Sequence, residues 1–195
     1  MMAPHPAPPI TPAPLSDGLV TVSPWTSEDA PVLYDAARES VATVGPWLPW
    51  LDAHYQRADA ERWVTASPQH WLQGSEFRFA VREATTGRLL GGAGLNHLNP
   101  MHRVGNLGYW VRASATGAGV ASRAARLVAR FGLTTAGLGR IEILTATDNH
   151  ASQRVADKIG ATFEGVLRDR LLMRDQRIPA RLYSLVRADL LGPLA

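Results

Sequence analysis

The sequence predicts one mixed α/β domain, with antiparallel strands early in the chain and βαβ units later. Two strand-like runs flank a turn at residues 84–87, a pattern typical of a hairpin. The run Trp110 to Phe131 passes from a strand through two glycines directly into a helix, and residues 141–160 repeat this strand-to-helix order. With 195 residues, 46% of them hydrophobic, the chain can bury the core of one such domain.

The first half of the chain is expected to hold two helices and three strands. The first helix runs to about Ser40, because Thr26 and Asp29 form a loose capping box at its start. Two prolines then interrupt the chain in the segment PWLPW, residues 46–50. The other elements expected here are a strand at Leu19 to Val22, a helix at Ala58 to Ala66, and strands at Phe77 to Glu83 and Arg88 to Leu95.

The second half is expected to alternate strands and helices before two closing strands. A helix over Asp148 to Gly160 is favoured because Asp148 or Asn149 can cap its start and Gly160 can end it in the left-handed conformation. The other expected elements are a strand at Val104 to Arg112, a long helix after the glycines, and strands at Ile141 to Thr147, Thr162 to Leu172 and Arg181 to Val186. We find no internal repeat and no second domain.

Composition narrows the class of protein. The net charge is only +3 and no long Lys or Arg block occurs, which argues against a nucleic-acid groove. The absence of cysteine excludes disulfides and a thiol nucleophile. Residues 1–14 are rich in proline and lack a secretory pattern, so we expect a disordered arm before a single domain at 15–195. No membrane span is evident, and we expect a cytoplasmic protein.

The run Trp110 to Phe131 has the pattern of an anion-binding turn. Glycines allow close approach of the backbone to a ligand, and the first helical turn offers unpaired N–H groups with partial positive charge. The alternative is an ordinary tight connection. A nucleoside triphosphate loop would need a Lys-Ser/Thr pair, where Ala121, Ser122 and Arg123 stand. A dinucleotide fold would want a third glycine at position 122.

The helix expected at Asp148 to Gly160 directs Ser152 inward. Ser152, Val155, Ala156 and Ile159 recur at spacings of three and four, so they share the face that meets the core. The hydroxyl of Ser152 either bonds to its own helix backbone or faces a cleft beside the sheet.

These segments resemble the GNAT family of N-acetyltransferases, and within it the branch that acetylates the N-termini of ribosomal proteins. The resemblance rests on GYWVRASATGAGVASRAARL, DNHASQRVADKIGATFEG, LYSLVRADL and PWLPW, and it covers roughly residues 15–192. It implies a central, mostly antiparallel twisted sheet, flanked by helices, with a parallel pair of strands splayed at the coenzyme A site. It also implies acetyl-coenzyme A as co-substrate, an amine acceptor and no metal.

The resemblance further implies which residues contact the coenzyme. The loop Thr116 to Ala121 would hold the pyrophosphate by backbone N–H groups, and the strand Tyr109 to Arg112 would pair with the pantetheine arm. Asn149 and Ser152 would lie near the thioester. Arg123 is expected to meet a coenzyme phosphate because of its position near the start of the helix. The full expected set is Tyr109, Trp110, Val111, Arg112, Thr116, Gly117, Ala118, Gly119, Val120, Ala121, Ser122, Arg123, Asn149 and Ser152.

The chain departs from the family pattern at several positions. Ser114 and Ala118 replace polar or basic residues of the loop, which backbone binding does not need. Leu171 aligns with an acidic residue that the ribosomal branch has just after the strand matching Ala161 to Gly165. The acceptor therefore stays open among a protein N-terminus, a polyamine, an aminoglycoside and other small amines.

The expected chemistry is direct attack of an amine on the thioester in a ternary complex. Ser152 is the candidate acid for the departing thiolate. His97 is a candidate base, with a solvent-exposed loop histidine as the alternative, and Glu142 is more simply explained by a salt bridge. Trp47 and Trp50 are expected to form one wall of the acceptor groove, with core packing as the alternative.

The other aromatic residues are expected to divide between the ligand site and the core. Tyr109 and Trp110 should face opposite sides of their strand, so that only one ring reaches the ligand. Trp25, Trp63 and Trp71 are expected to pack in the core. The alternative functions are a transferase with another donor, such as succinyl-coenzyme A, and a coenzyme-binding domain without turnover. The chain could act as a monomer or a homodimer.

Overall fold

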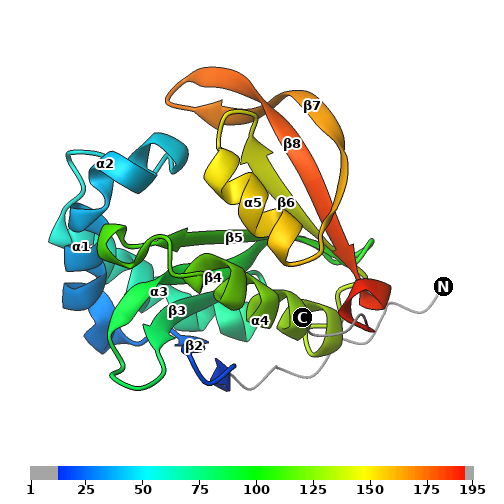
Figure 1. Cartoon of the computed structure of the whole chain (residues 1–195). Coiled ribbons are helices and arrows are strands. Elements are labelled where there is room, and N and C mark those ends of the chain that lie inside the picture. Colours follow the sequence, from blue (N-terminus) through cyan, green and yellow to red (C-terminus); the bar gives the residue numbers. More distant parts are fainter. Residues whose placement is uncertain (1–12, 192–195) are drawn as a thin grey trace.

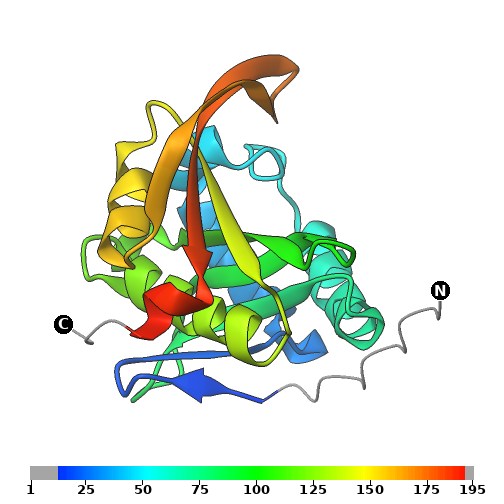
Figure 2. The ribbon, with the colours of Figure 1, turned by 90° about the vertical axis from the view of Figure 1, so that its right-hand side faces the viewer.

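The computed structural model describes residues 13–191 and contains one eight-stranded sheet with helices on both faces (Figures 1 and 2). The strand order is β1-β2-β3-β4-β5-β6-β8-β7. All neighbouring strands are antiparallel except β5 and β6, which are parallel. The expected fold, a mostly antiparallel sheet with one parallel pair, is confirmed. Most of the expected N-terminal arm lies outside the described residues.

The elements have the following bounds. The strands are β1 Leu15–Ser16, β2 Val20–Pro24, β3 Phe77–Glu83, β4 Leu89–Asn99, β5 Val104–Val111, β6 Arg140–Ala146, β7 Thr162–Met173 and β8 Gln176–Val186. The α-helices are α1 Ala30–Glu39, α2 Val41–Val44, α3 Arg57–Gln73, α4 Val120–Thr134 and α5 His150–Lys158. Short 3-10 turns cover η1 Ser27–Asp29, η2 Gly45–Trp47, η3 Ala113–Ala115 and η4 Arg187–Leu191.

The strands β3 to β5 form the meander on which the rest of the domain is assembled. The hairpin expected at residues 77–95 is present, and Gly87 adopts a φ of 73° at its turn. Successive side chains of β3 point to opposite faces. Phe79 therefore belongs to the core under α4, while Ala80 belongs to the core under α1 and α3. The sheet thus separates two apolar layers.

Several local expectations about helix ends are confirmed. The backbone N–H of Thr26 donates to Asp29, which completes the capping box at the start of η1 and α1. Asn149 caps α5, because its Oδ1 accepts from the N–H of Ser152 at 3.1 Å. Gly160 follows α5 with a φ of 83°, which places it in the left-handed region that favours glycine.

Two elements are longer than expected. The helix expected to end at Ala66 continues to Gln73 with Pro68 inside it, because the helix also packs the buried Trp71 against the core. The last strand starts at Gln176, not at Arg181. Arg174 and Asp175 both adopt positive φ there, 45° and 66°, as a tight two-residue hairpin turn requires, although neither residue is glycine.

The parallel pair is short, and this positions the site. β5 and β6 are in register only from Val104 opposite Arg140 to Asn106 opposite Glu142. β5 continues along β4 to Val111, and β6 continues along β8 to Ala146. In Figure 1 the part of the sheet formed by β6, β8 and β7 accordingly rises away from β5, with α5 beside it.

A substitution of Phe131 tests the packing of the core beneath α4. Phe131 is 6% exposed, and its ring centroid lies 5.2 Å from that of Phe77 and 5.3 Å from that of Phe79. Phe131→Ala should lower the free energy of unfolding by about 3–5 kcal/mol, measured by urea denaturation. Leu72→Ala, at a side chain 69% exposed, should change it by less than about 0.5 kcal/mol. Equal losses in the two variants would contradict this description of the core.

Candidate functional site

The free edge of β5 is the centre of the candidate site. Past Asn106 this edge has no paired residue in β6, so backbone groups from Leu107 to Val111 face the gap between the two strands. An unpaired strand edge can accept an extended, hydrogen-bonding ligand. The gap is bounded on its far side by α5, which supplies Ser152.

Tyr109 joins the two sides of this gap. Its phenol oxygen lies 3.0 Å from Oγ of Ser152 and donates to the Ser152 carbonyl at 3.1 Å. Burial raises the pKa of Tyr109 to about 12, so the phenol is neutral and able to donate. Ser152 faces inward, as expected from the helix periodicity. Its Oγ contacts the phenol of another element and is not confined to its own helix backbone.

The glycine turn lies at the end of the same strand. Gly117 and Gly119 have φ values of 81° and 75°, and a Cβ added to either would meet nothing within 4 Å. Both glycines are exposed, and Gly119 directly precedes α4. The first backbone hydrogen bond of α4 is donated by the Arg123 N–H to the Gly119 carbonyl at 3.1 Å. The N–H groups that precede Arg123 at the start of the helix are therefore available to an anion.

The end of α1 anchors the segment that leads into this turn. The carboxylate of Glu39 accepts from Nε of Arg112 at 3.1 Å and from the Ser114 N–H at 2.6 Å. Ser40 accepts from the Ala113 N–H at 3.0 Å and donates to the Ala36 carbonyl at 2.6 Å. Sequence reasoning missed this anchor, since its partners lie more than 70 positions apart.

The anchor is electrostatically strong. The Arg112 guanidinium, followed by the hydrogen bond from Ser114, lowers the pKa of Glu39 to about 2 against the opposing effect of desolvation. Arg112 also donates from Nη1 to the Leu89 carbonyl at 3.1 Å, which ties β4 to the same point. Three elements therefore converge just before the glycine turn, and we expect the turn to be preorganised.

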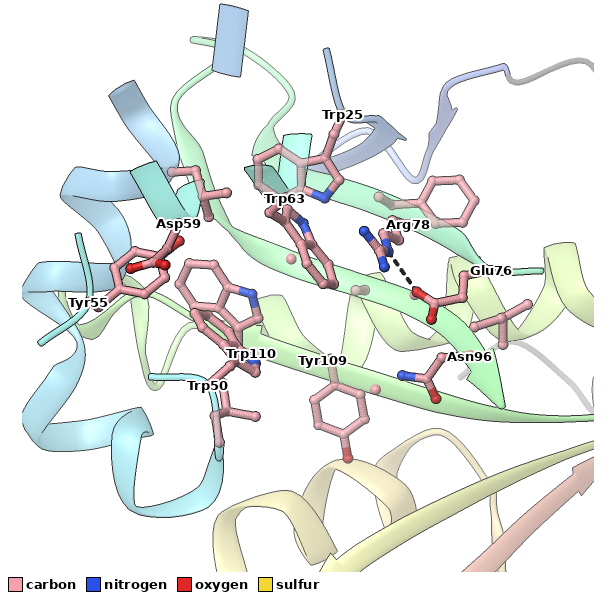
Figure 3. A pocket seen from close by; sticks show the side chains of 18 residues that line it. Trp25, Trp50, Tyr55, Asp59, Trp63, Glu76, Arg78, Asn96, Tyr109 and Trp110 are labelled. Carbon is pink, nitrogen blue, oxygen red and sulfur yellow. Dashed lines mark hydrogen bonds and ion pairs between the residues drawn. The ribbon is translucent and has the colours of Figure 1, made fainter. Parts of the chain in front are cut away.

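A cavity of about 320 Å³ opens beside β5 (Figure 3). Its walls come from α1, the loop that follows η2, α3, and strands β3 to β5. In Figure 3 the rings of Trp50 and Trp110 lie together on one side, and Tyr109 points from the cavity toward α5. Its aromatic lining comprises Trp25, Trp50, Tyr55, Trp63, Phe79, Tyr109 and Trp110.

Glycines form the floor of the cavity. Gly92 and Gly94 of β4 and Gly108 of β5 line it, and Gly94 is opposite Gly108 in the register. A Cβ on Gly92 would lie 2.7 Å from Nε1 of Trp110, so this glycine makes room for the indole. A Cβ on Gly108 would meet only the Asn96 side chain, at 3.8 Å. Glycines in strand interiors are typical of places where a ligand approaches the backbone closely.

Of the two tryptophans expected to form the acceptor wall, Trp47 and Trp50, only Trp50 lines the cavity. Trp50 lines the cavity and is 43% exposed, with its ring 5.9 Å from that of Trp110 in an edge arrangement. Trp47 lies in η2, is half-buried, and is not among the lining residues. Trp63, expected in the core, is 40% exposed and lines the cavity from α3, so that expectation is wrong.

Tyr109 and Trp110 both line the cavity, although they were expected on opposite sides of their strand. They do pack on opposite faces of the sheet, Tyr109 against the core under α4 and Trp110 against the core under α1 and α3. Because β6 diverges beyond Asn106, β5 is locally an edge strand, and the cavity extends around that edge.

The candidate bases lie away from the cavity. His97 is exposed with a φ of 50° in the irregular stretch of β4 between Asn96 and Asn99, and it does not line the cavity. Glu142 accepts from Nε of Arg140 at 3.1 Å, which confirms the salt-bridge interpretation. Leu171 is half-buried on β7, beside the register shift between Leu167 and Leu171.

Arg123 and Asn149 are partly engaged within the chain. Nη1 of Arg123 pairs with Asp17 at 2.8 Å, so a coenzyme phosphate would compete with this carboxylate. Asn149 uses Oδ1 for its helix cap. Within residues 13–191 no group of His, Asp and Glu is arranged to hold a metal ion. None of the helices over the same range is long and apolar enough to cross a membrane.

Residues 20–162 match the family model described as acetyltransferase (GNAT) domain. This is well over half of the chain, so the protein belongs to the GNAT family. It is 32% identical over 110 residues to the uncharacterised N-acetyltransferase YoaA of Bacillus subtilis, covering 56% of this chain and 62% of YoaA. It is 28% identical over 96 residues to the ribosomal-protein-serine acetyltransferase of Escherichia coli, covering 49% of this chain and 54% of that protein.

The chain thus spans between about half and two thirds of the length of these relatives. Among solved structures, RimJ of Mycobacterium smegmatis in complex with CoA-disulfide has a TM-score of 0.80 at 21% identity. The match covers 94% of this chain and 90% of that chain, and it shows that the fold is shared.

The Glu39 anchor generates a pH prediction. Since its pKa in the folded protein is about 2, below the ordinary value of 4.5, the carboxylate stabilises the fold above pH 4.5. That stabilisation is lost as the pH falls from about 4.5 toward 2. Glu39→Gln should make the fall of the urea midpoint over this window shallower than in the wild type, and should weaken coenzyme A binding.

Glu164 is the matched control for Glu39. Its pKa is also lowered to about 2, by Arg140 and then by Ser184, at the opposite end of the sheet from the glycine turn. Glu164→Gln should alter the pH profile of stability in the same direction while leaving coenzyme A affinity unchanged. A Glu39→Gln variant with a wild-type pH profile would show that the ion pair does not form in solution.

Proposed function

We propose that the protein transfers an acetyl group from acetyl-coenzyme A to a primary amine by direct attack in a ternary complex. The observation that carries this proposal is the free edge of β5, which the short turn η3 connects to the glycine turn before α4. The strand edge and the helix start each offer free backbone groups, one to an extended arm and the other to a pyrophosphate. Coenzyme A has this shape, and the solved RimJ structure contains a coenzyme A disulfide.

In the proposed complex the chain holds the donor mainly through its backbone. N–H groups from Gly117 to Ser122 bind the pyrophosphate at the start of α4. The edge of β5 from Tyr109 to Val111 pairs with the pantetheine arm, which places the thioester in the gap bounded by α5. Arg123 meets a coenzyme phosphate by exchanging its ion pair with Asp17.

The reaction then needs little acid or base assistance. The amine nitrogen forms a bond to the thioester carbonyl carbon, the carbon–sulfur bond breaks, and the amine proton passes to water. Ser152, held in place by the phenol of Tyr109, gives its hydroxyl proton to the departing thiolate and regains a proton from the water that accepted the amine proton. His97 is exposed and outside the cavity, so the proposed mechanism assigns proton removal to water and not to this residue. We propose a cytoplasmic location for this activity, as for ribosomal-protein acetylation.

The glycine turn is tested by Gly119→Val. A branched side chain at φ 75° is strained and would cover the N–H groups that bind the pyrophosphate. The dissociation constant for coenzyme A, measured by calorimetric titration, should rise at least about tenfold, the equivalent of about 1.4 kcal/mol.

Gly137→Val is the matched control for this test. Gly137 has a φ of 72° and open space around its Cα, like Gly119, but it lies between α4 and β6, away from the turn. The Gly137→Val variant should have similar backbone strain and an unchanged dissociation constant for coenzyme A. If the two variants bound coenzyme A equally well, the turn would not be the pyrophosphate site.

Ser152→Ala tests the route of the reaction. The variant keeps the carbonyl that Tyr109 contacts and loses only the hydroxyl. We expect kcat to fall roughly tenfold to a hundredfold, with little change in donor affinity, as for loss of one assisting proton donor. Tyr109→Phe should give a smaller loss, because it removes only the group that orients the hydroxyl. A wild-type kcat for Ser152→Ala at saturating amine would assign protonation of the thiolate to water.

A further inference from the structure

We propose that the acceptor is a primary amine carried by one compact, uncharged group with a large flat apolar face, such as an arylalkyl amine. This inference rests on the proposed function and names the acceptor class for the same site. It is drawn from the cavity above the glycine floor, whose aromatic walls, charge balance and position each restrict the substrate.

The walls favour a flat apolar group. Trp50, Trp63 and Trp110 surround a floor on which β4 and β5 present glycine instead of side chains. A flat ring can therefore lie directly against the backbone of Gly94 and Gly108 while its edges contact indole rings. A volume of about 320 Å³ is at the small end of ligand pockets, which suits one ring system with a short amine-bearing chain.

The carboxylates of the lining are already paired within the chain, whereas Nη1 of Arg78 is buried without a hydrogen-bond partner. Nε of Arg78 donates to Glu76 at 2.6 Å, and its guanidinium lies over the ring of Trp63 at 3.8 Å from the centroid. Asp59 pairs with Arg62 and accepts from the Gln56 N–H at 2.7 Å, where it caps α3. Both carboxylates of the lining, Asp59 and Glu76, therefore already have an arginine partner within the chain.

This charge balance decides among the acceptors that the sequence left open. A polyamine or an aminoglycoside brings several ammonium groups, and each would lose water without gaining a carboxylate partner. A single amine loses its charge before it attacks the thioester, so it needs no permanent counter-ion. Uncharged amines with apolar bodies are therefore favoured over polycations.

The cavity also adjoins the proposed reacting centre. Tyr109 lines it and at the same time contacts Ser152 across the gap that would hold the thioester. Gly108 precedes Tyr109 directly on β5 but faces the other side of the sheet, so an amine on the glycine floor would reach the proposed reacting centre around the free edge of β5. The amine on a short chain would extend from the floor past the Tyr109 ring.

The experiment measures release of free coenzyme A with a panel of amines at neutral pH. The panel contains phenethylamine, spermidine, kanamycin, and two short peptides that begin with Phe or with Ser. We expect kcat/KM for phenethylamine to exceed that for spermidine and kanamycin at least tenfold. Comparison with the Phe peptide then distinguishes a free amine from a peptide N-terminus as the source of the same apolar group.

A variant of the cavity floor provides a second, independent measurement. Gly108→Val introduces a side chain into the cavity without strain, since the position has no positive φ and its Cβ meets only Asn96. It should raise KM for phenethylamine at least tenfold and leave coenzyme A affinity unchanged. Gly139→Val, at an exposed glycine with a Cβ 3.9 Å from the Arg103 carbonyl, is the matched control and should change neither value.

The outcomes separate the two proposals. A preference for spermidine, kanamycin or the Ser peptide, with Gly108→Val silent, would overturn the acceptor class and leave acetyl transfer intact. If no amine in the panel were acetylated although coenzyme A bound, the proposed function would fail. The acceptor class would then be tested by quenching of tryptophan fluorescence with phenethylamine, which Gly108→Val should abolish. Phenethylamine that caused no quenching in the wild type would contradict the inference.

Discussion

The separation of β5 from β6 is the constraint on which the rest of the site depends. Each strand has a complete antiparallel neighbour, β4 for β5 and β8 for β6, but the two are paired with each other at only three positions. The gap is maintained from the far side by α5, where Nε2 of Gln153 donates to the carbonyls of Ala146 and Thr147 at 3.2 and 2.9 Å. A sheet with a complete β5–β6 ladder would have no free edge along β5 and no gap between the two strands.

Much of the fold and half of the site could be predicted, because their signals are local. Capping at Thr26 and Asn149, the hairpin at residues 77–95 and the glycine turn are each specified within a few consecutive residues. Ser152 was directed inward by helix periodicity alone. The helix expected at Ala58 to Ala66 continues through Pro68 to Gln73, since tertiary packing of Trp71 outweighs a single local preference.

The rest of the site depends on pairing between distant segments, which one sequence does not contain. The anchor joins Glu39 to Ser114, and nothing near either residue indicates the other. The floor exists because the register sets Gly94 opposite Gly108, whereas a shift by one residue would direct these positions to the other face. A signal was present in the unusual glycine content of LLGGAGLNH, at residues 89–97, but only the register shows which glycines share a face.

The paired charges in the cavity wall also bear on how an acceptor reaches the site. Glu76 pairs with Arg78 and Asp59 with Arg62, so the cavity wall offers little net charge to steer an amine inward. In the proposed complex an acceptor would enter by diffusion and burial of apolar surface, at a rate nearly independent of ionic strength. The anionic coenzyme would instead approach a helix start flanked by Arg123, where dissolved salt screens the attraction. The two substrates of the proposed reaction would thus respond differently to the same solution.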